Sequence, residues 1–287
     1  APLILKRIKP KLTIDVKNPK ETLYIEIREE ATYIYLKKIK GIGGFPVGVG
    51  GKASLLLSGG IDSPVSAYLA MKQGLYLEGI HFESTPMTSI ESVQKVIDIS
   101  KKLALYTPKH EFLVLMVPFM KIHKEILTNI PDSYTITIMR RAMFKIAEKI
   151  SNERGALAVV TGESVGQVAS QTLQSIRAIT DVVRIPILRP LLTYDKQDII
   201  DISRNIGTYN ISIRPFEDCC SIYVPVAPTT KPTIKRCRQY EGYIKDFDCL
   251  IEEAVKETKI WVIKPDSNID LSLLGFEIKE AWESINK

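Results

Sequence analysis

The sequence predicts an α/β protein with a Rossmann-like parallel sheet, preceded by a smaller region rich in strands. From residue 53 onward, short apolar runs alternate with longer segments of helical periodicity, which is the pattern of βαβ units. Before residue 50, apolar and polar residues alternate instead, as in half-buried strands. A glycine-rich stretch at 41–51 separates the two patterns and indicates a boundary loop.

The composition is that of a globular protein rather than a disordered chain. The 287 residues are 45% hydrophobic and carry a net charge of +6. No apolar run approaches the roughly 18 to 20 residues of a membrane-spanning helix, so we expect no membrane partner and a cytoplasmic location. The chain starts at Ala1 and enters a strand pattern almost at once, so we expect that an N-terminal portion precedes it. A homodimer is among the oligomeric states that the sequence leaves open.

The first 50 residues hold most of the net charge, with ten Lys or Arg against five Asp or Glu. We expect strands at 12–16, 23–27 and 33–36 and a turn at 18–20. A basic, strand-rich module suits a polyanion, and its candidate contacts are Lys37, Lys38 and Lys40. The alternative is a strand face whose charges are simply solvated.

The remaining elements alternate in type along the chain. Strands are expected at 53–57, 76–82, 112–117, 156–161 and 182–187. Helices are expected at 64–73, 90–105, about 138–154 and about 166–175, the second opened by a capping box at 88–91. After Pro232 we expect mostly helix. In a parallel sheet of this kind, ligands bind at the carboxyl ends of the strands.

The segment Ser-Gly-Gly-Ile-Asp-Ser-Pro at 58–64 lies between a predicted strand and a predicted helix. Gly59 and Gly60 permit backbone conformations closed to other residues and a close approach to an anion. We expect Ser63 to cap the helix and Pro64 to fit its first turn. Backbone N–H groups at a helix N-terminus then form a phosphate site.

Two further side-chain types support a nucleotide at this loop. Ser58 and Ser63 add hydroxyl donors. Asp62, placed where an anion binds, is best explained as a ligand of the Mg²⁺ that accompanies a nucleotide. Other nucleotide motifs fail, because Pro46 and Ala53 break a Walker loop ending at Lys52 and a strand follows it. The remaining alternative is an ordinary strand-to-helix turn.

The four cysteines are Cys219, Cys220, Cys237 and Cys249, and the chain has three histidines. No Cys-x-x-Cys pair is present, so a structural zinc site is not supported. We expect reduced thiols, of which one can be reactive.

Together, the motifs between about residues 40 and 230 resemble the PP-loop (ATP pyrophosphatase) superfamily. Within it, they resemble the thiamine-biosynthesis sulfurtransferase family, which includes the tRNA 4-thiouridine synthetases (tRNA uridine 4-sulfurtransferases). The matching motifs are Ser-Gly-Gly-Ile-Asp-Ser-Pro at 58–64, His81-Phe82, Arg140-Arg141, Thr-Gly-Glu-Ser-Val-Gly-Gln at 161–167 with Gln171, Arg-Pro-Leu at 189–191, Asp195-Lys196 and Glu-Asp-Cys-Cys at 217–220.

This resemblance implies a domain order. Residues 1–45 would be the last part of a THUMP domain, 46–231 a PP-loop domain related to the adenine nucleotide alpha hydrolases, and 232–287 a helical extension. Some family members add a C-terminal rhodanese domain. Too few residues follow Cys237 for such a domain here, so we expect a member without it.

The resemblance also implies roles for individual residues. The residues expected around ATP are Leu56, Leu57, Ser58, Gly59, Gly60, Asp62, Ser63, His81, Phe82, Arg140, Gly162 and Gln171. Because Arg140 and Arg141 are neighbours on a helix, one can face phosphate and the other solvent. The family needs a lysine at Lys196 for activity, and the second cysteine of its pair takes part in sulfur transfer, which points to Cys220. Without a rhodanese domain, Cys219 could replace the missing partner thiol.

The implied reaction is ATP-dependent thiolation of tRNA. The enzyme adenylates O4 of a uridine and replaces that oxygen with sulfur from a persulfide-carrying protein or sulfide, and the family also serves sulfur transfer in thiamine biosynthesis. Lys37, Lys38 and Lys40 would then contact RNA. The alternatives are a PP-loop ligase acting on a small metabolite and a non-catalytic RNA-binding protein. The sulfur donor and the modified uridine stay open.

Overall fold

The computed structural model describes residues 7, 15–216, 227–269 and 271. The chain forms two compact units, residues 1–43 and residues 44–287. Within the described ranges, every helix is too short or too polar to cross a membrane.

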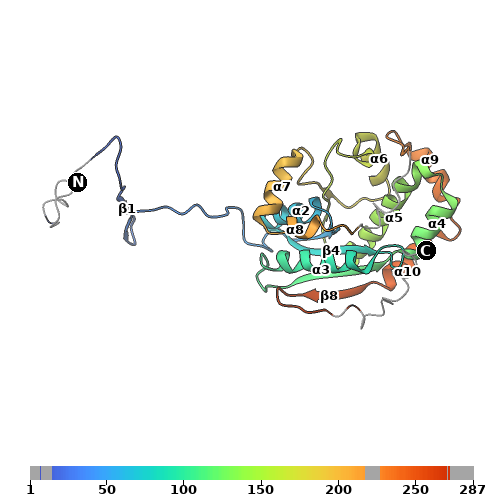
Figure 1. Ribbon diagram of the computed structural model, residues 1–287, viewed down its shortest axis with the longest axis horizontal. Coiled ribbons are helices and arrows are strands. Elements are labelled where there is room, and N and C mark those ends of the chain that lie inside the picture. The colour runs from blue at the N-terminus through green and yellow to red at the C-terminus, as the bar shows by residue number, and fades with distance from the viewer. Residues whose placement is uncertain (1–6, 8–14, 217–226, 270, 272–287) are drawn as a thin grey trace. The chain divides into compact units, whose positions relative to one another are not determined.

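The first unit contains a β-hairpin (Figure 1). Its strands are β1 (Tyr24–Ile27) and β2 (Thr32–Tyr35), which pair antiparallel with Tyr24 opposite Tyr35. The two tyrosine rings stack with centroids 5.2 Å apart, and Lys38 Nζ lies over both, at 5.0 and 5.6 Å. Residues 8–14 lie outside the described part, so most of the strand expected at 12–16 remains a prediction.

The second unit is built on a mostly parallel sheet, as the sequence predicts. The described strands follow the order β7-β6-β3-β4-β5-β8, and the pairs from β7 to β5 are parallel. Their bounds are β3 (Lys52–Leu56), β4 (Tyr76–Glu83), β5 (Phe112–Pro118), β6 (Val159–Val160), β7 (Ile187–Leu188) and β8 (Lys259–Ile263). This order places β3 in the middle of the sheet, with the loop at 58–63 directly after it.

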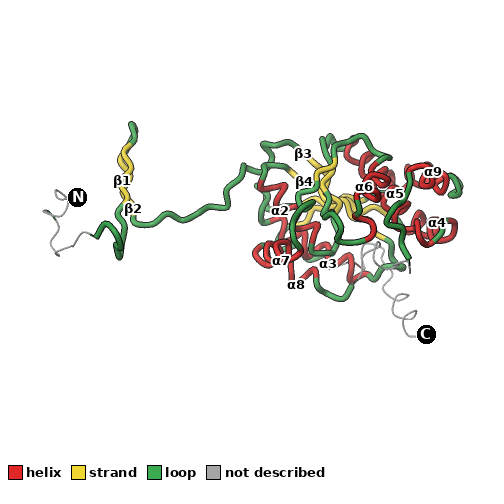
Figure 2. The backbone as a smooth tube through the Cα atoms, turned by 90° about the horizontal axis from the view of Figure 1, so that it is seen from above, coloured by secondary structure: helices red, strands yellow, loops and turns green. Residues whose placement is uncertain are grey.

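Helices cover both faces of the sheet. Its interior strands are almost continuously buried, with Leu55 and Ile80 fully enclosed, because apolar clusters pack on both sides. One group of helices comprises α2 (Asp62–Lys72), α3 (Ile90–Ala104), α7 (Lys196–Asn205) and α8 (Tyr209–Ser212). The other comprises α4 (Met120–Asn129), α5 (Asp132–Glu153), α6 (Leu173–Thr180), α9 (Ile234–Glu241) and α10 (Phe247–Lys256). Figures 1 and 2 show these groups apart, with the strands between them.

Some predicted elements differ from the structure. The helix expected at 166–175 is instead a short 3-10 turn, η1 (Ala169–Gln171), followed by α6, which begins later because Thr172 caps it by accepting a hydrogen bond from Ser175 N. The capping box expected at 88–91 is wrong in its register, since the N-cap of α3 is Ser89 rather than Thr88, and the Ser89 side chain makes no cap hydrogen bond. Helix α5 starts at Asp132, earlier than expected, and α4 was not predicted.

The C-terminal region contains a strand as well as helices. Helices α9 and α10 agree with the expected helical character after Pro232, but β8 then pairs antiparallel with β5 at the sheet edge. Its sequence, Lys-Ile-Trp-Val-Ile, is rich in β-branched and aromatic residues, which favour strands. The expectation of mostly helix after Pro232 therefore does not hold at β8.

Candidate functional site

The loop at 58–63 is closed by hydrogen bonds between its two serines. Ser63 Oγ donates to the Ser58 carbonyl oxygen at 2.9 Å and accepts from Ser58 N at 3.0 Å. Ser58 Oγ accepts from Gly60 N at 3.3 Å. Helix α2 begins at Asp62, so Ser63 lies inside its first turn and does not cap it, which corrects the sequence-based expectation. Its hydroxyl instead fixes the shape of the loop.

Gly162 brings the segment after β6 against this loop. A Cβ at Gly162 would lie 2.8 Å from Ser63 N and 2.9 Å from Asp62 C, closer than side-chain carbons approach backbone atoms. Nearby, Ser66 Oγ donates to the Thr161 carbonyl oxygen at 2.7 Å. Glycine at 162 is therefore required by the close packing of two backbone segments.

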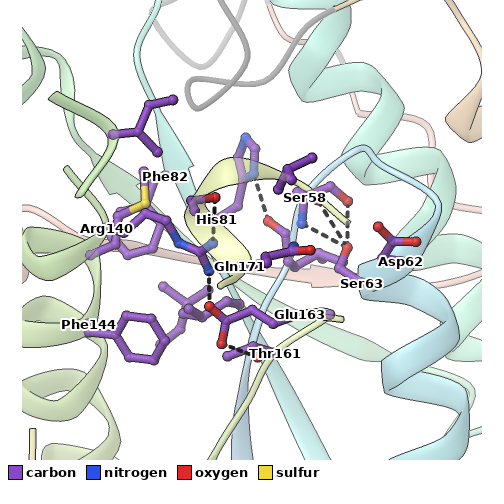
Figure 3. A pocket seen from close by; sticks show the side chains of 18 of the residues that line it. Ser58, Asp62, Ser63, His81, Phe82, Arg140, Phe144, Thr161, Glu163 and Gln171 are labelled. Atoms are coloured by element: carbon purple, nitrogen blue, oxygen red, sulfur yellow. Dashed lines mark hydrogen bonds and ion pairs between the residues drawn. The ribbon is translucent and has the colours of Figure 1, made fainter. Parts of the chain in front are cut away.

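A pocket of about 570 Å³ opens at the carboxyl ends of β3, β4 and β6. That volume is within the range of small-molecule and cofactor sites. Residues expected around ATP that line it are Leu56, Leu57, Ser58, Asp62, Ser63, His81, Phe82, Arg140, Gly162 and Gln171. Gly59 and Gly60 belong to the adjoining loop and do not line it. Figure 3 shows Arg140 and Phe144 on one side of the pocket and Ser58, Asp62 and Ser63 on the other.

The pocket combines an apolar wall with buried polar groups. Ile80, Met143 and Phe144 line it together with Phe82, whose ring packs edge-on against Phe119. Such a wall can bury a flat aromatic base. Gln171 Oε1 is buried and has no hydrogen-bond partner among the described residues, so an acceptor remains available at this wall.

His81 is held by the main chain. It is buried, and its Nδ1 lies 3.0 Å from the Leu57 carbonyl oxygen, so a proton on Nδ1 would join β4 to the end of β3. The side chain also lines the pocket. His81 can therefore link two strands and also lines the pocket.

Arg140 and Arg141 point to different surroundings, but neither simply faces solvent. Arg140 lines the pocket, and its Nη2 lies 2.6 Å from Glu163 Oε1. Arg141 is 1% exposed and pairs with Glu241, with Nε 2.9 Å from Oε1 and Nη2 3.0 Å from Oε2. The expectation that the second arginine can face solvent is therefore wrong, because α5 is covered on that side by α9 and α6.

Lys196 is the first residue of α7 and reaches the loop. Its Nζ lies 2.7 Å from Asp62 Oδ1. With its amide oriented to suit both neighbours, Gln167 donates to Asp62 Oδ2 at 3.3 Å and accepts from Lys196 Nζ at 3.2 Å. The structure thus brings together two predicted catalytic residues and adds Gln167. Its place in the 161–167 motif was the only sequence signal.

Asp62 is suited to a metal that arrives with its ligand. The described residues contain no group of three or more His, Cys, Asp or Glu side chains that could hold a metal ion. Mg²⁺ is commonly held by one or two carboxylates together with substrate phosphates. The single Asp62 carboxylate beside an anion-binding loop fits that arrangement.

The cysteines fall into two groups. Cys219 and Cys220 lie outside the described residues, so their expected roles stay predictions. Cys237 is buried in α9, and burial raises the pKa of its thiol, so it is a poor nucleophile. Cys249 is exposed on α10.

The fold and the site define an α/β domain of the PP-loop type, in which a glycine-containing loop follows the central strand. The family model of the thiamine biosynthesis protein (ThiI) matches residues 48–245, and the chain belongs to this family.

The chain is similar to two bacterial relatives named probable tRNA sulfurtransferase. It is 54% identical over 273 residues to that of Acholeplasma laidlawii, covering 95% of this chain and 66% of the relative. It is 52% identical over 253 residues to that of Bacillus pumilus, covering 88% and 62%. The chain therefore spans slightly less than two thirds of the length of these relatives.

A solved structure of a 4-thiouridine synthetase in complex with RNA and bound ATP is also similar. It matches with a TM-score of 0.84 and 42% sequence identity, over 92% of this chain and 68% of that one.

Proposed function

We propose that the chain carries the catalytic part of an ATP-dependent tRNA uridine sulfurtransferase, which replaces O4 of a uridine with sulfur. The observation that carries this proposal is the loop at 58–63, which lies with Asp62 and Lys196 beside a pocket of about 570 Å³. Its support comes from the family membership and from the 42% identity to a 4-thiouridine synthetase solved with RNA and ATP.

ATP would lie across the pocket with its base on the apolar wall and its phosphates at the loop. Phe82 and Phe144 offer the apolar surface, while Arg140 and the N-terminus of α2 offer positive charge. His81, Gly162 and Gln171 complete the enclosure.

The first chemical step would be attack of the uridine O4 on the α-phosphorus of ATP. Pyrophosphate would leave toward the 58–63 loop, where backbone N–H groups and Lys196 can stabilise its charge. The adenylated C4 is then an electrophile. Hydrosulfide attacks C4, and AMP departs with the former O4 oxygen. A persulfide on Cys220 would displace AMP in the same way, and the Cys219 thiolate would then break the S–S bond of the adduct. This would release the thiolated uridine and leave a Cys219–Cys220 disulfide, which an external thiol reductant must reduce before the next turnover.

Mg²⁺ fits this site through the Asp62 carboxylate and would neutralise charge on the departing phosphates. Before ATP arrives, Lys196 holds that carboxylate by its ammonium group. We therefore propose that Lys196 leaves Asp62 and pairs with the phosphates when ATP binds.

Sulfur delivery would involve the two adjacent cysteines. Cys220 is the proposed carrier, with Cys219 as its resolving partner, whereas buried Cys237 and exposed Cys249 have no assigned role. The donor would be a persulfide-carrying protein or sulfide. Because the matching family model is that of a thiamine biosynthesis protein, the same sulfur transfer is also proposed to serve thiamine biosynthesis.

RNA contacts are proposed for the first unit. Lys38 Nζ lies over the stacked Tyr24 and Tyr35 rings, and Lys37 and Lys40 add positive charge close to it in the sequence. Basic side chains contact phosphates, and exposed aromatic rings can stack on unpaired bases.

The test is incubation of the chain with unmodified tRNA, Mg-ATP and sulfide. Thiolated uridine, followed by its near-ultraviolet absorbance, should form only when ATP and tRNA are both present, with one AMP released per sulfur. Release of AMP from ATP when a small metabolite replaces tRNA would favour another PP-loop ligase. RNA binding without any AMP formation in the complete mixture would indicate a non-catalytic RNA-binding protein.

A further inference from the structure

Glu163 is a buried carboxylate in the pocket wall that the proposed reaction leaves without a role. It is 1% exposed and follows β6 at the carboxyl end of the sheet. Its Oε1 accepts from Arg140 Nη2 at 2.6 Å, and its Oε2 accepts from Arg189 Nε at 2.7 Å. Thr161 Oγ1 adds a third hydrogen bond to Oε2 at 3.1 Å. Figure 3 shows Glu163 directed at the Arg140 guanidinium from below the pocket.

The charges of this cluster favour an anion. Two guanidinium groups share one carboxylate, which leaves the cluster of Glu163, Arg140 and Arg189 with one net positive charge, although Arg189 itself does not line the pocket. Burial by itself raises the pKa of Glu163. The charges of Arg140 and Arg189 and the hydrogen bonds from Arg189 and Thr161 lower it by more than burial raises it, so the pKa lies below its usual value. Glu163 is therefore ionised at neutral pH and bonds both arginines through charge-assisted contacts.

The contacts determine which donors remain for a ligand. Arg140 uses Nη2 for Glu163, whereas in the described part of the chain its Nη1 makes a single long contact, at 3.5 Å from Ser170 Oγ. Arg189 Nη2 is buried and has no hydrogen-bond partner among the described residues. A free arginine side chain has many rotamers, and the bond to Glu163 restricts Arg140 to one of them.

We infer that Glu163 is a positioning residue for the nucleotide phosphates. It holds the Arg140 guanidinium at the pocket wall, so that the donor not used by Glu163 faces the phosphates, while Arg189 keeps the cluster positive. This inference rests on the proposed ATP site and adds to it a residue that makes no contact with ATP itself.

The chain contains a matched buried carboxylate away from the pocket. Glu78 is 3% exposed and also pairs with two cations, Arg154 and Lys52, near the opposite end of β4. Its side chain does not line the pocket. Loss of the Glu78 charge thus reproduces the general cost of breaking a buried ion cluster without altering Arg140.

The experiment compares Glu163→Gln with Glu78→Gln by calorimetric titration with Mg-ATP, AMP and adenosine. Glu163→Gln should raise the dissociation constants of ATP and AMP by about tenfold or more, the value of a charge-assisted hydrogen bond. Adenosine, which has no phosphate, should bind both variants as it binds the unaltered chain. Glu78→Gln should lower the melting temperature and leave ATP affinity within about twofold.

A double-mutant cycle separates positioning from a purely structural role. If Glu163 acts through Arg140, Glu163→Gln should have little effect once Arg140 is absent. Added to the Arg140→Met variant, it should raise the dissociation constant of ATP by less than about twofold. The inference would be overturned if the two substitutions raised the dissociation constant of ATP by independent factors that multiply in the double variant. It would also be overturned if Glu163→Gln weakened the binding of ATP and of adenosine equally. Glu163→Asp, which keeps the charge, replaces Glu163→Gln if that variant does not fold, and should show a smaller loss with the same selectivity for phosphate.

Mg-ATP binding by the unaltered chain distinguishes failure of the proposed function from failure of the role inferred for Glu163. If it does not bind Mg-ATP, the proposed function fails. If it binds Mg-ATP and Glu163→Gln binds equally well, only the role of Glu163 is wrong.

Discussion

Lys196 Nζ lies 2.7 Å from Asp62 Oδ1, although 134 residues separate them in the chain. The two side chains are 46% and 26% exposed. An ion pair this exposed is worth about 0 to 1 kcal/mol, so phosphate or a metal can separate it at little cost. The contact therefore places a cation and a carboxylate together at the loop while leaving both exchangeable.

Asp62→Ala should abolish adenylation and leave the fold intact. The carboxylate contacts Lys196 and Gln167 at the surface of the loop and supports no apolar core. Pyrophosphate release in the presence of tRNA should fall at least about a hundredfold, the scale of losing a preorganised electrostatic contact, with an unchanged circular dichroism spectrum. Equal pyrophosphate release in the variant would contradict the assignment of Asp62.

Gly162→Ala should weaken ATP binding through the shape of the loop. The added Cβ would meet Ser63 N at 2.8 Å and push the loop out of position. We expect a loss of about tenfold or more in affinity, equivalent to roughly 1.4 kcal/mol. Gly41→Ala is the control, since a Cβ there meets nothing within 4 Å among the described residues. Similar losses in both variants would argue against steric displacement of the loop.

The adjacent arginines should separate binding from stability. Arg141→Met leaves Glu241 without its buried partner, and such a loss costs about 3 to 5 kcal/mol of the free energy of unfolding. Arg140→Met should instead reduce ATP affinity with a smaller change in stability, because buried Glu163 keeps its hydrogen bonds from Arg189 and Thr161. Denaturant titration and calorimetry on both variants measure the two effects, and reversed results would refute the placement of the side chains.

The cysteines should separate adenylation from sulfur transfer. Cys220→Ala should stop thiolation from a persulfide donor while pyrophosphate release continues, because adenylation needs no thiol. Cys249→Ser should be fully active, and Cys237→Ser should be active but less stable, because Cys237 is buried.

Cys219→Ala is the discriminating variant. Loss of persulfide-dependent activity would show that the adjacent thiols act together, and full activity would leave the sulfur on Cys220 or a separate protein. Normal thiolation by Cys220→Ala with every donor would disprove a role for that thiol.

Charge reversal at Lys37, Lys38 and Lys40 should weaken tRNA binding without altering ATP affinity. Each phosphate contact releases a condensed counterion, so log affinity falls linearly with log salt, and the slope should become shallower in the triple variant. Filter binding over a series of salt concentrations measures that slope. An unchanged slope would mean that these lysines form only a solvated face.

Much of the fold follows from patterns within single segments. Apolar runs such as 53–57 and 112–117 predict buried parallel strands, and the structure confirms them as β3 and β5. The predictions from sequence were less accurate for some other helices and strands. Strand β8 has a strand-like sequence of its own, but it pairs with β5, which is remote in the chain. The later start of α6 is by contrast a local feature, because Thr172 caps the helix three residues from Ser175.

The sequence by itself determined the anion loop, since strand, glycine pair, acid and helix follow one another within a few residues. Only the tertiary structure decided which distant side chains surround that loop. Lys196 reaches Asp62, Glu163 joins Arg140 to Arg189, and Arg141 is buried rather than solvated. The physical reason is that loop geometry depends on local backbone conformation, whereas side-chain partners depend on helices and strands packed from remote parts of the chain.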